Sequence, residues 1–441
     1  MAGEFAEEKK AGSVKILSTG KVKPKKEIGR KECQLVTFDL PYLAFYYNQK
    51  LIIYKTGDDF EGIVERLKDG LAVVLEEFYQ LAGKLDKDED GVFKVVYDDD
   101  MEGVEVVAAS AEEVDVAELT AEDGTSKFKE LLPYNGILNL EGLHKPLLAV
   151  QITKLKDGVA MGCAFNHAIL DGTSTWHFMS AWAGICSGSS NSVATPPFLD
   201  RTKARNTRVK LNLSQPSDAP EHAKSAVTAK PLREKVFKFS ESAIDQIKSK
   251  VNAAGSKPFS TFQSLSAHVW SAVTRARELK PEEYTVFTVF ADCRKRVDPQ
   301  MPESYFGNLI QAIFTVTAAG LILSSPVEFG ADLIRSAIES HDAKAIDARN
   351  SEWESNPIIF QFKDAGVNCV AVGSSPRFKV YEVDFGWGRP ESVRSGLNNR
   401  FDGMVYLYPG KDGGRSIDVE ITLDDDSLKR LAKDKEFLME I

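Results

Sequence analysis

The sequence predicts an α/β protein with two similar-sized domains, each built on a mixed sheet. The chain has 441 residues, enough for two ordinary domains. Strand-like and helix-like segments alternate through both halves, and a long segment rich in Ser, Asn, Pro, Lys and Arg separates them. We therefore expect an N-terminal domain over 1–186, a crossover loop over 187–233 and a C-terminal domain over 234–441.

The composition is typical of a globular protein in a reducing compartment. Apolar residues make up 43% and charged residues 27% of the chain, and the net charge of −10 weighs against a nucleic-acid partner. The longest apolar region, which begins at Leu309, is interrupted by Gln, Thr and Gly, so no transmembrane segment is expected. The charged N-terminus lacks the apolar core of a signal peptide. The five cysteines are widely spaced without a CxxC pair, which favours free thiols and a cytosolic protein.

The N-terminal half opens with strand-like segments and one long helix. Residues 33–55 contain two apolar runs on either side of a Leu-Pro turn. Residues 60–83 carry apolar side chains at steps of three and four, which is the spacing of one helix face. We expect Gly83 to end this helix.

A β-hairpin precedes the sequence HAILDG. Two apolar runs within 144–165 flank Lys156-Asp157-Gly158, which is a turn signal. From Ser174 onward the apolar residues return to helical spacing. The motif is therefore expected between a strand and a helix.

The C-terminal half repeats the mixture of strands and covering helices. A strand followed by a helix capped near Ser240 is expected first, and 257–278 predicts a stronger helix with a capping box formed by Ser260 and Gln263. A short helix is expected from about Ser427. Further strands are expected at 284–297, 308–317, 378–388, 403–410 and 415–423.

His167 and Asp171 of HAILDG are the candidate catalytic residues. A neutral imidazole can take a proton from a hydroxyl near neutral pH, which typically accelerates a reaction by about 10²–10⁴. Asp171 would orient the ring or hold the turn, and Gly172 would let the backbone turn tightly. The alternative is a polar turn without a catalytic role, because HxxxD is a short pattern. The histidine spacing is not that of a zinc protease and no GxSxG occurs, so neither a metal site nor a nucleophile elbow is expected.

HAILDG followed later in the chain by DFGWG resembles the BAHD family of plant acyl-CoA-dependent acyltransferases. The segments FYQLAGKL, ADCRKR and YFGN fall in the order of that family's other landmarks. The resemblance covers essentially the whole chain and implies the chloramphenicol-acetyltransferase-like fold, with an active-site channel between the two domains. Acyl-CoA is then a co-substrate that meets the acceptor at the motif histidine, and no permanently bound cofactor is implied.

The resemblance also implies a role for each motif residue. His167 is the general base that deprotonates the acceptor hydroxyl, which attacks the thioester directly without an acyl-enzyme. Asp171 is expected to turn away from the channel and to pair with Arg294, which makes it structural.

The DFGWG segment is implied to be structural as well. Asp384, Gly386 and Gly388 are expected to shape the channel wall. Trp387 could donate its indole N–H to the oxyanion of the tetrahedral intermediate, and a packing role is the alternative.

One helix start is a candidate contact for CoA. Lys257 stands just before Ser260 and Thr261, so an ammonium and free N–H groups would meet there, which suits a phosphate. An ordinary helix cap explains Ser260 equally well, and only the resemblance places CoA near this helix.

Four stretches resemble a family member that acts in the plant cuticle: 37–50, 125–143, 305–315 and 362–388. This closer resemblance implies a hydroxy fatty acyl or glycerolipid acceptor in cutin formation, and ester formation by a cytosolic, monomeric enzyme. The alternatives are a specialised-metabolite acyltransferase, for example with a hydroxycinnamoyl-CoA donor, and a thioesterase-like hydrolase with water as acceptor. A catalytically silent acyl-CoA-binding protein is disfavoured because both motifs are intact.

Overall fold

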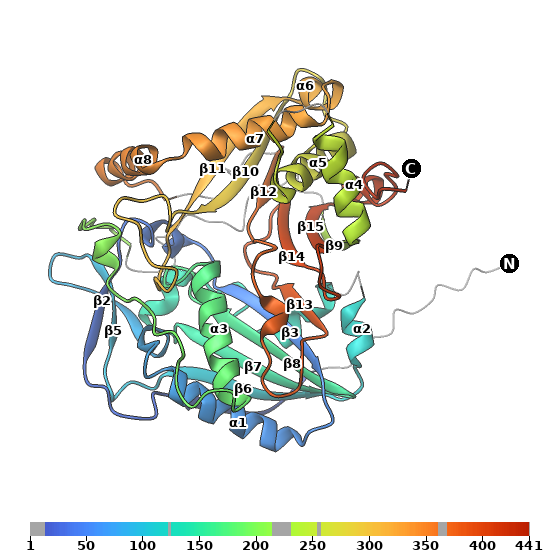
Figure 1. Ribbon diagram of the computed structural model, residues 1–441. Coiled ribbons are helices and arrows are strands. Elements are labelled where there is room, and N and C mark those ends of the chain that lie inside the picture. Colours follow the sequence, from blue (N-terminus) through green and yellow to red (C-terminus); the bar gives the residue numbers. More distant parts are fainter. Residues whose placement is uncertain (1–13, 122–124, 214–230, 254–256, 360–367, 441) are drawn as a thin grey trace.

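The protein is built on two six-stranded sheets that lie one above the other (Figure 1). The computed structural model describes residues 14–121, 125–213, 231–253, 257–359 and 368–440. Among the helices within these ranges, none combines the length and the apolar character that a bilayer crossing requires. All five cysteines are buried free thiols, as the sequence predicts.

The first sheet carries the strand that leads into HAILDG. Helices α1 (Phe60–Val74) and α3 (Gly172–Cys186) share a hydrophobic core with this sheet. A smaller sheet of β2 (Lys31–Gln34), β5 (Phe93–Tyr97) and β4 (Lys84–Lys87) lies beside it. The strand order of the first sheet is β1 (Lys15–Val22), β6 (Val104–Ala111), β7 (Leu148–Leu155), β8 (Gly158–Phe165), β3 (Asn48–Lys55) and β13 (Ser392–Ser395).

The second sheet lies in the C-terminal half, with helices on one of its faces (Figure 1). Its strand order is β11 (Ile310–Ala318), β10 (Tyr284–Asp292), β12 (Cys369–Val372), β14 (Met404–Pro409), β15 (Ile417–Asp424) and β9 (Leu232–Phe239). The helices of this half are α4 (Glu241–Val251), α5 (Thr261–Ala276), α6 (Ala319–Ser324), α7 (Glu328–Ser340), α8 (Ala343–Ser355) and α9 (Asp425–Leu431).

The two-residue period of a strand divides the second sheet into a helix-covered face and a face toward the first domain. On β10, Phe287 and Val289 belong to the core beneath the helices, whereas Thr288 and Phe290 line a cavity on the opposite face. The same alternation on β14 sends Val405 to the helices and Tyr406 to a cavity. The second sheet therefore forms a wall of the interdomain space.

Several predicted elements are confirmed. β7 and β8 form the hairpin around the Lys156–Asp157 turn, and Ser240 caps α4. Ser260 and Gln263 form the capping box of α5: the Ser260 side chain accepts the Gln263 N–H, and the Gln263 side chain accepts the Ser260 N–H. These are the elements with local signals in the sequence.

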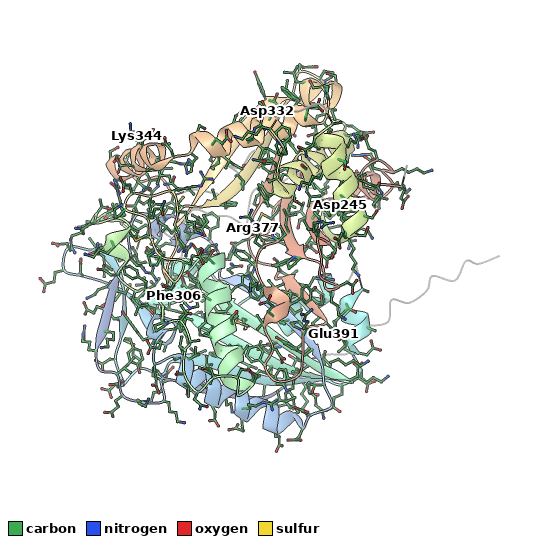
Figure 2. The ribbon with its side chains drawn as sticks, in the orientation of Figure 1. Asp245, Phe306, Asp332, Lys344, Arg377 and Glu391 are labelled. Atoms are coloured by element: carbon green, nitrogen blue, oxygen red, sulfur yellow. The ribbon has the colours of Figure 1, made fainter. Side chains whose placement is uncertain are left out.

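The helix predicted over 60–83 is too long, because α1 ends at Val74. The chain bends there and continues as the 3-10 turn η2 (Tyr79–Ala82) before β4. The bend buries Phe78, which packs edge-on against Phe306 of the C-terminal half with ring centroids 5.1 Å apart; Figure 2 labels Phe306 beside α3. The apolar spacing continues beyond the helix because the turn buries the same side chains.

The strand predicted over 378–388 is wrong. This segment contains the 3-10 turn η8 (Val380–Glu382) and then an irregular loop. Val380, Val383 and Phe385 are buried, which explains the strand-like pattern. The loop is instead set by a carboxylate and two glycines with positive φ, as described below.

Both halves of the sequence build the first sheet. β13 pairs antiparallel with β3, so the sixth strand of the first sheet comes from residues 392–395 of the C-terminal half. Of the predicted crossover, residues 187–213 and 231–233 are described. The first part carries the short turn η5 (Arg201–Lys203), and β9 begins at Leu232. Arg201 is buried in η5 and pairs with the buried Asp39 at 3.0 Å. The boundaries at 186 and 233 stay a prediction, and 214–230 lie outside the described residues.

Candidate active site

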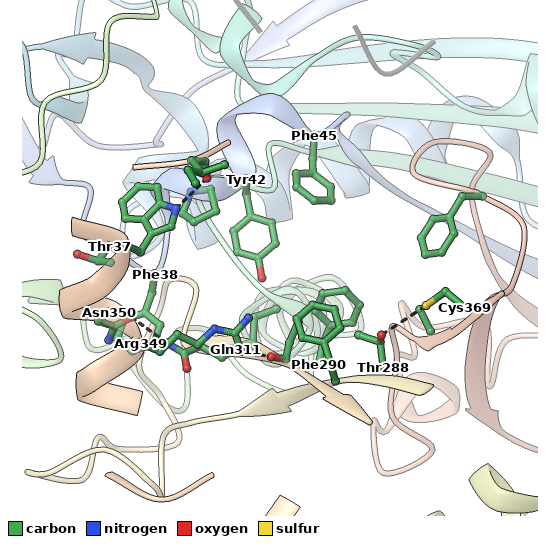
Figure 3. Close-up of a pocket in the computed structure, with 18 residues that line it drawn as sticks. Thr37, Phe38, Tyr42, Phe45, Thr288, Phe290, Gln311, Arg349, Asn350 and Cys369 are labelled. Atoms are coloured by element: carbon green, nitrogen blue, oxygen red, sulfur yellow. Dashed lines mark hydrogen bonds between the residues drawn. The ribbon is translucent and has the colours of Figure 1, made fainter. Parts of the chain in front are cut away.

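Two adjoining cavities lie between the domains. The larger has a volume of about 490 Å³ and is lined mostly by apolar side chains, among them Phe38, Phe290 and Phe401 (Figure 3). The smaller, of about 80 Å³, is lined by His167. Tyr42, Phe45, Phe290, Ile310 and Phe401 contribute to both walls, so the two cavities adjoin. We call them the large cavity and the small cavity.

His167 is held at the small cavity by its own backbone. It follows the end of β8 by two residues, and its N–H donates to Oδ1 of Asn139 at 2.8 Å. Its carbonyl accepts from Nδ2 of Asn308 at 2.8 Å. Asn308 is the asparagine of YFGN, so a residue of the C-terminal half fixes the position of the histidine.

The His167 ring is stacked on a tyrosine. The Tyr42 and His167 ring centroids are 4.5 Å apart with an interplanar angle of 7°. Nδ1 of His167 is enclosed by protein, which leaves Nε2 as the nitrogen for a substrate. Burial lowers the pKa of His167, and its own carbonyl and the Asp171 carboxylate act in the opposite direction. The imidazole is therefore neutral at pH 7 and able to accept a proton.

Asp171 caps α3 rather than contacting the imidazole. Its Oδ1 accepts the Ser174 N–H at 3.0 Å, and its Oδ2 accepts the Leu309 N–H at 3.0 Å. Arg294 donates to both oxygens, from Nη1 at 2.8 Å and from Nη2 at 3.0 Å. Burial opposes ionisation, but the Arg294 charge and these hydrogen bonds lower the pKa of Asp171 overall. The carboxylate thus joins the start of α3 to the C-terminal half.

Arg294 is almost fully buried, and its guanidinium donates hydrogen bonds to oxygens other than those of Asp171. Nη2 also donates to Ser174 Oγ at 3.1 Å and to the Tyr305 carbonyl at 3.0 Å. Burial opposes the charge, but Asp171 raises the pKa of Arg294, so the pair stays ionised. The side chain that the family resemblance names as the partner of Asp171 is therefore at hydrogen-bond distance from it.

The glycine at position 172 is required for a reason other than the predicted tight turn. Its backbone does not adopt a positive φ, so the turn itself does not demand glycine. A Cβ at this position would lie 2.9 Å from Cζ of Phe378. Gly172 and Phe378 both line the small cavity. The glycine therefore makes room for an aromatic side chain in the cavity wall.

The DFGWG loop is organised by Asp384. Its Oδ1 accepts the N–H groups of Gly386 at 2.7 Å and of Gly388 at 2.9 Å. Gly386 has φ +103° and Gly388 has φ +89°, values that favour glycine. Among the described residues, the walls of the two cavities include none of 384–388, and the expectation that this loop shapes the channel wall stays a prediction.

Trp387 lies too far from His167 to stabilise an oxyanion there. Its ring packs edge-on against Tyr54, and the Arg66 guanidinium lies 5.2 Å from its centroid. A Cβ on the neighbouring Gly386 would lie 3.6 Å from Ser187, the C-cap of α3. His167 lies before the other end of this 15-residue helix, which is about 22 Å long. The oxyanion role predicted for Trp387 is therefore wrong, and the packing alternative describes its contacts.

The candidate CoA contact is exposed. Lys257 pairs with Glu339 at 2.7 Å, and both side chains are largely solvent-exposed. Ser260 accepts the Gln263 N–H as the N-cap of α5, and Thr261 is the first residue of that helix. These three residues lie together at one helix start, away from the walls of both cavities.

Sequence reasoning missed most polar residues of the cavities, and three of them bear on the chemistry. Tyr42 directs its hydroxyl into the large cavity (Figure 3), and Asn48 and Lys50 line the small one. Lys50 is 5% exposed. The sequence did contain a signal for Lys50. It lies in phase with Ile52 and Tyr54 on a strand that is buried on both faces, where a lysine is unusual.

The arrangement can abstract a proton next to an apolar space. A neutral imidazole with Nε2 toward a small cavity meets the geometric need of a general base. The adjoining large cavity falls in the usual size range of small-molecule sites.

Comparisons with known proteins place the chain among transferases. The sequence profile of the family described as "Transferase family" matches residues 12–438. "BAHD acyltransferase DCR" of Arabidopsis thaliana is 63% identical over 448 aligned positions, which cover 97% of this chain and 92% of the relative. "Hydroxycinnamoyltransferase 2" of Oryza sativa subsp. japonica is 30% identical and covers 90% of this chain and 91% of the relative.

Solved structures share the fold. Vinorine synthase superposes with a TM-score of 0.77 at 20% identity and covers 97% of this chain and 98% of its own. TRI101 of F. sporotrichioides, complexed with coenzyme A and T-2, gives a TM-score of 0.76 at 21% identity and covers 93% and 98%. The predicted two-domain α/β fold is thereby confirmed. Together with the profile and the 63% identical relative, this shows that the chain belongs to the BAHD family of acyl-CoA-dependent acyltransferases.

Proposed function

We propose that this acyltransferase forms esters on hydroxylated lipid acceptors, with His167 as the general base. The observation that carries the proposal is the position of His167: its neutral ring lines a small cavity that adjoins a large apolar one. A long aliphatic chain suits the large cavity because few polar groups there would lose their hydration. The resemblance to the cuticle protein Defective in Cuticular Ridges supports a hydroxy fatty acyl or glycerolipid acceptor in cutin formation.

The proposed chemistry is a direct transfer. Nε2 of His167 takes the proton of the acceptor hydroxyl as its oxygen attacks the thioester carbonyl. The tetrahedral intermediate then collapses, the carbon–sulfur bond breaks, and the CoA thiolate takes the proton from the imidazolium. In this scheme Asp171 and Arg294 hold the turn that carries His167 and do not contact the substrate.

The remaining parts of the proposal concern the contact with CoA, the oligomeric state and the cellular compartment. We place a CoA phosphate at Lys257, Ser260 and Thr261, where Lys257 would exchange its exposed partner Glu339 for the phosphate. CoA in the complex of the structural neighbour TRI101 supports acyl-CoA as the co-substrate. We propose a monomer, because the apolar cavity lies between domains of a single chain. We propose the cytosol as its compartment, because all five cysteines are free thiols.

A hydroxycinnamoyl donor is the second candidate. Aromatic side chains dominate the large cavity, among them Phe38, Phe45, Phe290 and Trp353, and they would also stack on a planar ring. Relatives of about 30% identity are named hydroxycinnamoyltransferases. The chain length of the preferred donor or acceptor separates the two candidates.

A thiol-release assay with a panel of acyl-CoA donors, with and without alcohols, tests the proposal. We expect CoA release that depends on a hydroxylated lipid, with the ester identified by mass spectrometry. Release without any alcohol would instead show a thioesterase-like hydrolase, and binding without turnover would show a silent acyl-CoA-binding protein.

His167→Ala is the matching variant. We expect about 10²–10⁴-fold lower kcat with little change in the melting temperature, because the ring contributes the base and the backbone keeps its own hydrogen bonds. A rate near that of the unaltered protein would contradict the base assignment.

A further inference from the structure

The small cavity contains a buried ammonium without an anionic partner. Lys50 of β3 is 5% exposed and lines the same cavity as His167. Its Nζ donates to the Tyr408 hydroxyl at 3.3 Å and lies 5.6 Å from the centroid of the Tyr406 ring. Within the described part of the chain, Lys50 forms no ion pair.

Glu420, the carboxylate that raises the pKa of Lys50, already has other partners. Glu420 of β15 pairs with Arg400 and accepts the Ser395 N–H at 3.2 Å. Arg400 in turn donates to Thr422 Oγ1 at 3.0 Å. A lysine that is buried for structural reasons is ordinarily paired, because an unpaired buried charge is strongly unfavourable. Among the residues that the structure describes, no carboxylate pairs with Lys50, so its ammonium is open to an anionic group of a ligand.

A second polar group lies beside Lys50. Asn48 is two residues earlier on β3, so the two side chains leave the same face of the strand, and both line the small cavity. The side-chain amide of Asn48 makes no hydrogen bond within the described residues. An amide N–H and an ammonium on one face form a donor pair that suits a carboxylate or a phosphate.

Lys50 stays mostly charged near neutral pH although burial opposes its charge. Desolvation lowers its pKa to about 8, with Glu420 raising the value and Arg400 lowering it further. Most Lys50 side chains therefore carry a proton at pH 7. The charge is available to a ligand.

We propose that Asn48 and Lys50 form a subsite for an anionic oxygen group, a carboxylate or a phosphate, that a substrate carries near its reacting atoms. The small cavity measures only about 80 Å³ and includes His167, so a group held at Lys50 lies a few bonds from the atoms at the imidazole. The subsite rests on the proposed function and narrows its substrate class to molecules with an anionic group. An amphipathic substrate would place its chain in the large cavity and its anionic head on Lys50.

Three matched substrate pairs test the subsite and identify the source of the anion. Two pairs vary the acceptor: a fatty acid hydroxylated near its carboxylate against its methyl ester, and a monoacylglycerol phosphate against the monoacylglycerol. The third varies the donor: succinyl-CoA against butyryl-CoA. For each pair, the ratio of kcat/KM between the anionic and the neutral member is measured.

We expect a ratio of at least about tenfold in one pair, and a fall of that ratio toward one in Lys50→Met. Lys50→Arg should retain most of the preference, because it keeps the charge. Lys55→Met is the control, since Lys55 lies on the same strand but is exposed and pairs with Asp157. It should keep the ratio of the unaltered protein.

Two outcomes overturn the subsite. One is a ratio near one in every pair for the unaltered protein. The other is a preference that Lys50→Met leaves intact. Failure of the proposed function looks different, because the enzyme would then transfer no acyl group to any hydroxylated acceptor, charged or neutral.

Discussion

At the level of single residues, the stacked pair of Tyr42 and His167 decides how the base is presented. The ring of Tyr42 covers one face of the imidazole at 4.5 Å. Tyr42→Phe keeps this stack, whereas Tyr42→Leu removes it and lets the imidazole rotate. We expect at least about tenfold lower kcat for the leucine variant, because a misplaced base transfers protons poorly.

The phenylalanine variant is the control for the stack. It should retain most of the rate, since only the hydroxyl in the large cavity is lost. Equal losses in both variants would show that the hydroxyl, and not the stack, matters. Steady-state kinetics with saturating donor measure the difference.

The pH dependence of kcat/KM follows from the burial of His167. General-base catalysis needs the neutral imidazole, so the rate falls as the pH drops through the pKa of His167. Because burial lowers this pKa below its ordinary value of about 6.5, the acidic limb should lie below pH 6.5. A limb above pH 6.5 would contradict the described environment. Tyr42→Leu, which admits water, should move the limb upward.

The sequence could predict the chemistry of single residues but not all of their partners. His167 follows from its motif, whereas Arg294 is 123 positions from Asp171 and no local pattern links the two. Only the family resemblance pointed to this pair. Trp387 shows the reverse case: its residue type suggested a donor, but its place at the far end of α3 depends on tertiary packing.

At the level of elements, the stability of the protein should depend strongly on the start of α3, where Asp171 pairs with Arg294. Asp171→Asn removes the charge opposite the buried Arg294 and should lower the free energy of unfolding by about 3–5 kcal/mol. The folded fraction should keep kcat within about tenfold, since the carboxylate does not contact the cavity. Urea denaturation and kinetics on the same preparation measure both effects.

Asp292→Asn provides the matched control. Asp292 also lies near Arg294, with Oδ2 3.3 Å from Nη1, but its side chain is 45% exposed. The same substitution there should cost at most about 1 kcal/mol of Coulomb energy. If Asp171→Asn abolished activity at unchanged stability, its structural role would be refuted.

Elements with local signals were predictable, and those set by tertiary contacts were not. The capping box of α5 and the hairpin turn are encoded in neighbouring residues. The end of α1 at Val74 is not, because Phe78 continues the apolar spacing while it packs on Phe306. The four residues of β13 are too short for a strand signal, and their pairing with β3 exists only in the folded chain.

For the whole molecule, we expect the two domains to unfold together. β13, the Asp171–Arg294 pair and Phe306 each connect the two halves of the sequence. Val393→Ala, which shortens a buried side chain of β13, should therefore lower hydrogen-exchange protection in α5 as well as in β3. Mass spectrometry of peptides from both elements measures this. A loss confined to β3 would show that the domains unfold separately.

The position of β13 also has a consequence for synthesis on the ribosome. The other five strands of the first sheet lie within residues 15–165, but the partner of the outer edge of β3 emerges only with 392–395. Until then that edge presents unpaired backbone groups, on which an unrelated strand could form. The nascent N-terminal half should therefore be most prone to non-native strand pairing until residues 392–395 have been synthesised.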